Sequence, residues 1–268
     1  MVVEVRPAAE RFRSVDVGTD SRHSFSFGRH YDPTNVGFGS LTAYNEETVE
    51  PGHGFPDHAH AEVEIVTWVL AGALAHTDSL GSTSVLRPGD LQVQSAGTGI
   101  VHAEIGHPTA GATRFVQAWL RPDQPGGEPA VAVGQLGPGE RLIGAPRLAA
   151  GGQGAPVRLR TSGAALWLSH LVPGEHASLP TGPLQHIHVA AGRVRLPGQA
   201  PPLTEGDCLR LVEEQGLALV AETRVELLIW SFAHRSSVPG SSSPRSDESR
   251  ARPRSTPGRR DPDDEGAG

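Results

Sequence analysis

The segment from residue 54 to residue 104 carries two x-spaced pairs of polar side chains, and it restricts the possible folds more than any other segment. The pairs are His58-x-His60 and His102-x-Glu104, and alternating apolar runs with glycine-containing turns separate them. Successive side chains of a β-strand point to opposite faces, so both members of a pair can share one face. Three imidazoles and a carboxylate suit Fe, Mn, Ni, Cu or Zn. The spacing therefore favours a metal site on strands over histidines that only make hydrogen bonds.

The composition favours many short strands over long helices. The chain has 33 Gly, 23 Pro and 37% hydrophobic residues, which is typical of strands joined by frequent turns. No apolar run approaches the ~20 residues that span a bilayer. Charged residues stand where a signal peptide has its apolar part, and the single Cys208 fits a reducing compartment. We therefore predict a cytoplasmic protein with no membrane segment.

The charge balance argues against nucleic acid as a partner. The formal net charge is −7, and binding to a phosphate backbone requires a concentrated basic surface. No direct nucleic-acid binding is expected.

The two halves of the chain repeat the same turn at the same stage. The sequence LRPGDL at residues 86–91 has its counterpart in LTEGDC at residues 203–208. Repetition of this kind, within runs of short strands, predicts an all-β fold made of two β-barrels. We expect four parts along the chain: an N-terminal metal-binding barrel at 1–125, a connector at 126–154, a C-terminal barrel without a metal site at 155–234, and a tail at 235–268.

The tail is expected to be disordered. Residues 235–268 are rich in Ser, Pro, Arg and Asp and have almost no apolar residues. Such a segment cannot bury enough surface to offset the entropy of ordering.

A second histidine pair, His186-x-His188, does not match the first pair in position. His58 and His60 lie 14 and 12 residues before Gly72, whereas the same distances before Gly192 reach Ser178 and Pro180. His102 lies 13 residues after Gly89, and 13 residues after Gly206 comes Leu219. We therefore expect His186 and His188 to be surface or interface residues. The other histidines are expected to be ordinary polar residues, except that His23 and His30 could line the mouth of the first barrel.

Three segments together resemble the pirin family of the cupin superfamily. They are HSFSFGRHYDP, GFPDHAHAEVEIVTWVLAGALAHTDSLG and VLRPGDLQVQSAGTGIVHAE. The resemblance covers residues 20–120 closely and the second half loosely. It implies a bicupin, that is, two jelly-roll-like cupin barrels, with metal in the N-terminal barrel alone.

Carried over to this sequence, the family's metal ligands are His58, His60, His102 and Glu104. Other cupins use the glutamate of the first motif, which is Glu64 here. We favour Glu104 as the ligand and expect Glu64 to support the ligands or to join a hydrogen-bond network in the core. The resemblance implies one divalent metal per chain, with Fe(II) as the expected ion and Zn, Mn, Ni, Cu or Co as alternatives. Ala59 and Ala61 depart from the residues that many members have there.

The resemblance implies a quercetin 2,3-dioxygenase type of activity on a small aromatic substrate such as a flavonol. Glu104, by swinging off the ion, is the candidate catalytic base for the substrate hydroxyl. Apolar walls are expected from Phe55, Val66, Trp68 and Ile100. The alternative is a non-catalytic, redox-sensing iron protein that binds a regulatory protein partner. A sugar or organic-acid isomerase would need substrate-orienting polar residues that the sequence does not reveal.

Overall fold

The computed structural model describes residues 2–136, 146–198, 200–214 and 216–233. The predicted disordered tail at 235–268 lies outside the described residues, as does the middle of the predicted connector. No helix among the described residues is long and apolar enough to cross a membrane.

The described chain is built almost wholly of strands, as predicted, with one short 3-10 helix, η1 (Ala8–Glu10). The strands up to residue 135 are β1 (Val2–Arg6), β2 (Phe12–Asp16), β3 (Thr19–His23), β4 (Leu41–Val49), β5 (Gly54–His60), β6 (Glu64–Ala71), β7 (Leu74–Asp78), β8 (Thr83–Leu86), β9 (Asp90–Ser95), β10 (Ile100–Gly106), β11 (Thr113–Leu120) and β12 (Ala130–Gln135). The later strands are β13 (Arg147–Gly151), β14 (Val157–Arg158), β15 (Ala164–Leu171), β16 (His176–Ser178), β17 (Leu184–Ala191), β18 (Arg193–Arg195), β19 (Leu203–Thr204), β20 (Cys208–Val212), β21 (Ala218–Ala221) and β22 (Val225–Phe232).

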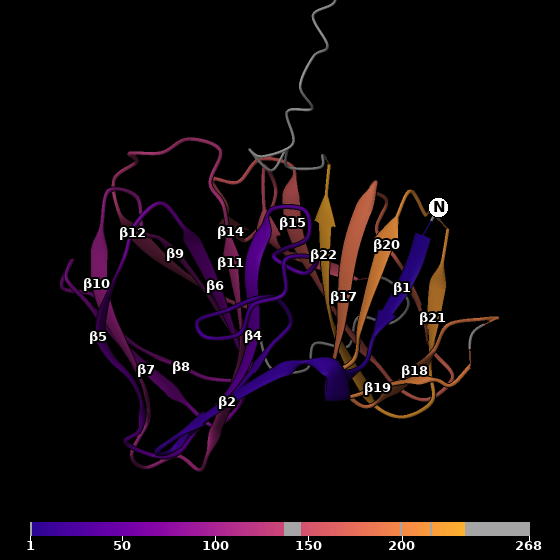
Figure 1. The fold of residues 1–268 in the computed structure, drawn as a ribbon, viewed down its shortest axis with the longest axis horizontal. Helices are drawn as coiled ribbons and strands as arrows, with labels where there is room; N and C mark the ends of the chain where they lie inside the picture. The colour runs from indigo at the N-terminus through magenta and orange to yellow at the C-terminus, as the bar shows by residue number, and fades with distance from the viewer. Residues whose placement is uncertain (1, 137–145, 199, 215, 234–268) are drawn as a thin grey trace, which may run out of the picture. The chain divides into compact units, whose positions relative to one another are not determined.

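The two halves have matching sheet topologies, which confirms the predicted duplication. The N-terminal barrel pairs a seven-stranded sheet, β12-β9-β6-β11-β4-β3-β2, with a four-stranded sheet, β5-β10-β7-β8. The C-terminal barrel pairs the seven-stranded sheet β1-β20-β17-β22-β15-β13-β14 with the four-stranded sheet β16-β21-β18-β19. Figure 1 shows the two large sheets facing each other, with β5, β7 and β10 on one outer side and β18, β19 and β21 on the other. Strand for strand, β9, β6, β11 and β4 correspond to β20, β17, β22 and β15.

The same glycine turn follows the equivalent strands β6 and β17. Gly72 has a φ of 75° and Gly192 a φ of 85°, in the left-handed region that L side chains rarely adopt. A Cβ at Gly72 would also lie 2.7 Å from the Thr113 Cα atom, and one at Gly192 would overlap the Arg224 carbonyl oxygen. Both positions therefore require glycine.

The first strand corrects the predicted division of the chain. Residues 1–125 were assigned to the N-terminal barrel, but β1 pairs with β20 in the C-terminal sheet, with Val3 opposite Leu211. In Figure 1 the indigo β1 lies beside β20, away from the other early strands. The predicted connector also contains ordered strands, since β12 pairs with β9 and β13 with β15. Periodicity predicts that a strand forms, but it does not predict which strand will pair with it. The pairing of β1 with the C-terminal sheet therefore could not be predicted from the sequence pattern.

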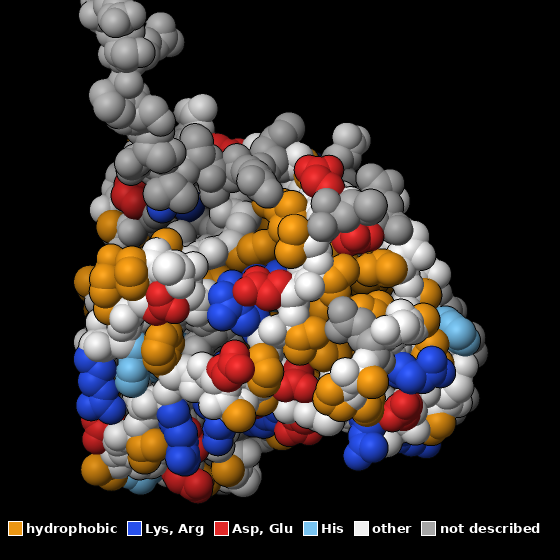
Figure 2. All heavy atoms as spheres, turned by 45° about the vertical axis from the view of Figure 1, so that its right-hand side comes forward, with side chains coloured by type: hydrophobic (Ala, Val, Ile, Leu, Met, Phe, Trp, Pro, Cys, Tyr) orange, Lys and Arg blue, Asp and Glu red, His pale blue; other side chains and the backbone are white. Residues whose placement is uncertain are grey.

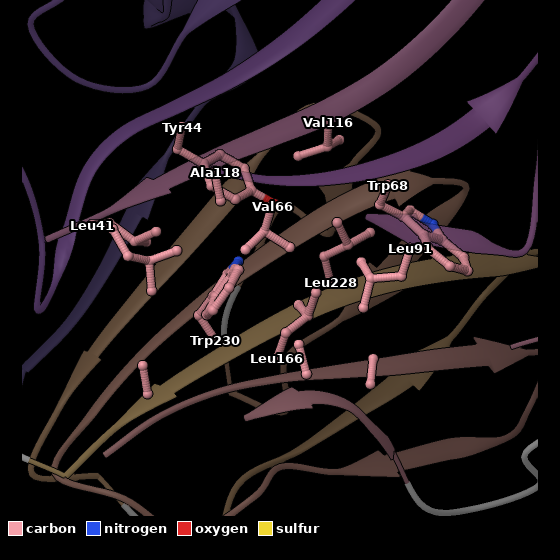
Figure 3. Close-up of a cluster of buried hydrophobic side chains, with 14 of the residues drawn as sticks. Leu41, Tyr44, Val66, Trp68, Leu91, Val116, Ala118, Leu166, Leu228 and Trp230 are labelled. Atoms are coloured by element: carbon pink, nitrogen blue, oxygen red, sulfur yellow. The ribbon is translucent and has the colours of Figure 1, made fainter. Parts of the chain in front are cut away.

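A shared hydrophobic core lies between the two large sheets. Figure 3 shows side chains of β4, β6, β9 and β11 meeting those of β15 and β22. Tyr44 and Trp230 are fully buried there, and Trp68 is 3% exposed. Because both barrels supply this core, its burial holds them together as one compact unit.

The outer face of the molecule has no dominant charge in the view of Figure 2. Acidic and basic side chains of the described residues alternate there with hydrophobic ones. The predicted metal ligands lie instead inside the N-terminal barrel.

Candidate metal centre

The strand β10 brings the predicted site residues together. It lies between β5 and β7 in the four-stranded sheet. His102 is opposite His58, Ile100 is opposite His60, and Glu104 is opposite His76. Directly opposite residues of an antiparallel pair point to the same face. The register therefore turns all of these side chains toward the barrel interior.

Three imidazoles form one donor group, which we call the outer triad: His58, His60 and His102. Their ligand atoms lie within 4.8 Å of one another, and the ring centroids of His58 and His102 are 4.4 Å apart. His58 Nδ1–H donates to the Pro56 carbonyl oxygen at 2.8 Å, which leaves the His58 Nε2 lone pair free. The Nε2 atom of His60 and both ring nitrogens of His102 are buried without a hydrogen-bond partner among the described residues.

A second donor group, the inner triad, consists of His76, His102 and Glu104, all buried. His76 Nε2 is 3.0 Å from Asp78 Oδ2, while the other oxygen of Asp78 accepts the backbone N–H groups of Leu80 and Ser82. This arrangement leaves His76 Nδ1 buried without a partner. The predicted residues His58, His60, His102 and Glu104 thus fall into two groups that share His102.

Sequence reasoning missed His76, which it treated as an ordinary polar residue. The available signal was the pair His76-x-Asp78, which has the same spacing as the two recognised pairs. Both residues lie on one strand, because β7 continues to Asp78.

Burial shifts the pKa values of the candidate ligands. It lowers the pKa of His60 to about 4, with the nearby His58 adding to the effect. It lowers the pKa of His102 to about 3, again with smaller contributions from neighbouring histidines. Burial also raises the pKa of Glu104. These imidazoles are therefore neutral at neutral pH and keep the lone pairs that a metal requires.

The carboxylate of Glu104 is held by neighbouring strands. The Gln117 side-chain amide donates to Glu104 Oε1 at 3.0 Å and to Oε2 at 2.8 Å. The Thr67 hydroxyl lies 3.4 Å from Oε1. Neutral imidazole nitrogens without partners, next to a buried carboxylate, form a donor set that can bind a transition-metal ion.

Glu64 lies outside both donor groups, in a hydrogen-bond network of the core. It is 1% exposed and accepts hydrogen bonds from Ser95 Oγ, from the backbone N–H of Arg160, and from both the N–H and the hydroxyl of Thr161. These contacts join the N-terminal barrel to the segment that leads into β15. The network role expected for Glu64 agrees with this geometry.

Two of the four predicted apolar walls point elsewhere. Val66 and Trp68 belong to the core between the barrels, and the Trp68 indole N–H donates to Glu226 at 2.6 Å. They alternate along β6 with Thr67, which faces Glu104. The prediction erred because a strand with both faces buried shows no polar alternation to identify its inner face. Phe55 does lie beside His58, with ring centroids 6.5 Å apart.

Aromatic rings connect the outer triad to an open groove. Trp119 makes an edge contact with His60 at 4.8 Å, and Phe27 makes one with Trp119 at 5.2 Å. Phe27 in turn stacks on His23 at 4.8 Å. Phe27, His23 and Phe55 line a groove of about 630 Å³ beside β2 and β3. His23 therefore lines this groove; its predicted place at the mouth of the first barrel stays a prediction.

His186 and His188 are not surface residues. Both are fully buried on β17 and point at β4 of the other barrel. The His186 ring is 4.6 Å from that of Tyr44, and the Tyr44 hydroxyl is 3.1 Å from His188 Nδ1. The alternative, an interface position, is the one the structure shows. Among the described residues, neither histidine joins a group of three or more potential metal ligands.

Comparison with known proteins places these features in a family. The sequence model of the pirin family matches residues 5–120. A Mycobacterium tuberculosis protein provisionally named quercetin 2,3-dioxygenase is 41% identical over 232 residues, which is 86% of this chain and 95% of that protein. An Escherichia coli protein named quercetin 2,3-dioxygenase is 38% identical over 125 residues, which is 47% of this chain and 54% of that protein.

A solved structure agrees in fold and carries a metal. The crystal structure of the bacterial pirin YhhW from Escherichia coli, in complex with nickel(II), has a TM-score of 0.77 and 28% sequence identity. The match covers 87% of this chain and 99% of that one. The Mycobacterium tuberculosis relative is 41% identical over 95% of its length, the pirin model matches residues 5–120, and the solved pirin has the same two-barrel fold. The chain therefore belongs to the pirin family.

Proposed function

We propose that this protein is a metal-dependent dioxygenase of the quercetin 2,3-dioxygenase type, which acts on flavonol-like aromatic substrates. The observation that carries the proposal is the outer triad, whose ligand atoms lie within 4.8 Å of one another. Ring contacts lead from His60 through Trp119 to Phe27, which lines the groove. The names of the relatives support the same substrate class.

In this proposal His58, His60, His102 and Glu104 hold one Fe(II) ion. The unpartnered nitrogens of His60 and His102 fit this role, because buried polar atoms are seldom left without a partner unless they serve a ligand. When bound, such an ion supplies Lewis acidity and one-electron chemistry toward dioxygen.

The protein's own contribution begins with binding of the substrate rings. Phe27 and Phe55 line the groove, and Trp119 lies between Phe27 and His60. Flat aromatic walls hold a planar ring system and exclude water. The aromatic substrate would enter past Phe27 and present its hydroxyl to the triad.

Glu104 then acts as the proton acceptor. The O–H bond of the substrate's 3-hydroxyl breaks, and its proton passes to a Glu104 carboxylate oxygen. Burial raises the pKa of Glu104, which makes the carboxylate a stronger base than a solvated one. Loss of this proton leaves the flavonol electron-rich and open to oxidation.

The test is oxygen consumption with quercetin. Protein loaded with Fe(II) should consume oxygen in step with the loss of flavonol absorbance, and chelation followed by desalting should abolish both. Mn, Co, Ni, Cu and Zn should be loaded in parallel to identify the active ion. Equal rates with and without metal would contradict the proposal, and metal binding without oxygen uptake would favour the redox-sensing alternative.

The substrate wall can be tested separately. Phe27→Ala should raise the KM for quercetin, because stacking of two aromatic rings contributes about 0.5–1.5 kcal/mol beyond the area that it buries. Metal content should stay the same. The exposed Tyr31 provides a matched control, since Tyr31→Ala removes an aromatic ring outside the groove.

A further inference from the structure

Glu104 is held in an orientation that separates it from the outer triad. Its ligand atoms group with those of His76 and His102, but not with those of His58 and His60. Both carboxylate oxygens accept from the same Gln117 amide, at 3.0 Å and 2.8 Å. A carboxylate that is to serve both as a ligand and as a base needs a defined position away from the ion, and Gln117 would hold Glu104 in such a position.

Gln117 is itself oriented by a third residue. The indole N–H of Trp119 donates to Gln117 Oε1 at 2.8 Å. An indole N–H can only donate, so the amide oxygen must face Trp119 and the amide NH₂ must face Glu104. The order Trp119 to Gln117 to Glu104 is therefore fixed by donor and acceptor chemistry. It connects Trp119, whose ring contacts Phe27 of the groove, to the carboxylate.

We propose that Gln117, oriented by Trp119, is a positioning residue that receives the Glu104 carboxylate when it is off the metal ion. This inference rests on the proposed function, because it assumes that Glu104 alternates between the ion and substrate. A bifurcated hydrogen bond from the amide NH₂ to both oxygens of a charged carboxylate stabilises the off-ion position. Gln117 thereby keeps Glu104 from binding the ion so firmly that it cannot serve as a base.

For Gln117→Leu we expect tighter metal binding together with a lower kcat. Without the amide, the buried carboxylate has lost its main partners away from the ion, and its equilibrium shifts toward coordination. Metal affinity should rise about 10-fold, the equivalent of one charge-assisted hydrogen bond. At saturating metal, kcat should fall about 10-fold while the KM for quercetin stays nearly constant. A residue that only supports the fold would weaken metal binding and activity together.

Two further variants make the test decisive. Trp119→Phe keeps the aromatic ring but removes the donor that orients the amide, so it should change metal affinity in the same direction by a smaller factor. Gln185→Leu is the matched control: Gln185 is a buried glutamine on β17 of the C-terminal barrel, and its amide nitrogen donates to the Glu214 carbonyl oxygen at 3.5 Å. It should leave metal affinity and kcat unchanged.

The measurements are Ni(II) and Fe(II) affinities by chelator competition, with oxygen uptake for each loaded variant. Tighter metal binding with lower kcat in Gln117→Leu supports the inference. Weaker or unchanged metal binding in that variant overturns it. If Gln117→Leu does not fold, the direction of the change in Trp119→Phe decides. A wild-type protein that binds no metal would instead refute the proposed function.

Discussion

The interiors of the two barrels differ in chemistry, although their strands are arranged alike. In the N-terminal barrel the strands β5, β7 and β10 turn histidines and Glu104 inward, and Gln117 lies among them. In the C-terminal barrel the interior is filled by leucine, isoleucine, valine and alanine side chains. At the position equivalent to His102 stands Leu219, which is fully buried. The candidate metal ligands lie in one barrel, and the other barrel contributes apolar burial.

The two His-x-His pairs also differ between the barrels, in the direction that their imidazoles face. On β5 the pair faces the interior of its own barrel, opposite His102 and Ile100. On β17 the pair alternates with Ile187 and Val189, which fill the barrel interior, so its imidazoles face the neighbouring barrel. The same spacing therefore gives a ligand pair in one place and an interface in the other. The strand on which the pair lies, and the face it shares, decide which.

The largest effect should come from cutting the apolar interior at the position that matches the metal site. Leu219→Ala should lower the free energy of unfolding by about 2–5 kcal/mol, since it removes buried methylenes and leaves a cavity. His102→Ala in metal-free protein should cost much less, because the imidazole it removes is buried without a partner. Urea unfolding in the presence of a chelator measures both. Equal losses would show that the two interiors contribute alike to stability.

The interface between the barrels should be sensitive to acid. Glu46 on β4 contacts Arg11, Arg114 and His188. Burial acts to raise the pKa of Glu46, but the nearby His188 and the two arginine charges outweigh it and hold the pKa well below its usual range. A lowered folded-state pKa means that this stabilisation is complete above the unfolded-state value near 4.5 and is lost as the pH falls below it.

Replacing that carboxylate isolates the acid effect. Glu46→Gln should lower stability at pH 7 by about 3 kcal/mol, because it leaves buried arginine charge without its partner. Between pH 5 and pH 2 its stability should depend less on pH than that of wild type. A parallel pH dependence in both proteins would show that other carboxylates govern acid unfolding.

The two glutamates of the N-terminal barrel should separate metal binding from stability. Glu104→Gln should weaken metal binding by about 10- to 100-fold, the usual loss when a ligand or its support is altered. Oxygen uptake should fall further than the metal loss explains, because the proposed base is gone. Glu64→Gln should keep the metal but lower stability by about 1–3 kcal/mol, since two backbone N–H donors lose a charged acceptor.

The contrary result for this pair is equally clear. If Glu64→Gln loses the metal while Glu104→Gln keeps it, the ligands are His58, His60, Glu64 and His102. Metal content per chain and urea unfolding of both variants provide the comparison.

The sequence predicted the barrels and the three recognised histidines because those features are local. A pair spaced by one residue shares a strand face wherever the strand lies, so His58 with His60 and His102 with Glu104 could be paired without knowledge of the fold. Non-local features could not be obtained this way. The pairing of β1 with β20 depends on contacts more than 200 residues apart in the chain, about which local spacing contains no information.

The second feature that could not be predicted from the sequence is which core each face of a strand enters when both of its faces are buried. Trp68 on β6 and His186 on β17 lie on strands whose two faces are both buried. Without exposed polar residues to mark one face, the pattern cannot say which core a side chain enters. The same ambiguity explains why Glu64 and Glu104, both nearly fully buried, could be ranked as ligands only through the family resemblance.

The most direct test of the difference between the barrels is the metal content of the purified protein by elemental analysis. We expect one divalent transition-metal ion per chain, unchanged in the double variant His186→Ala/His188→Ala and absent in His58→Ala/His60→Ala. Two ions per chain, or loss of metal from the His186→Ala/His188→Ala protein, would contradict a metal centre confined to the N-terminal barrel.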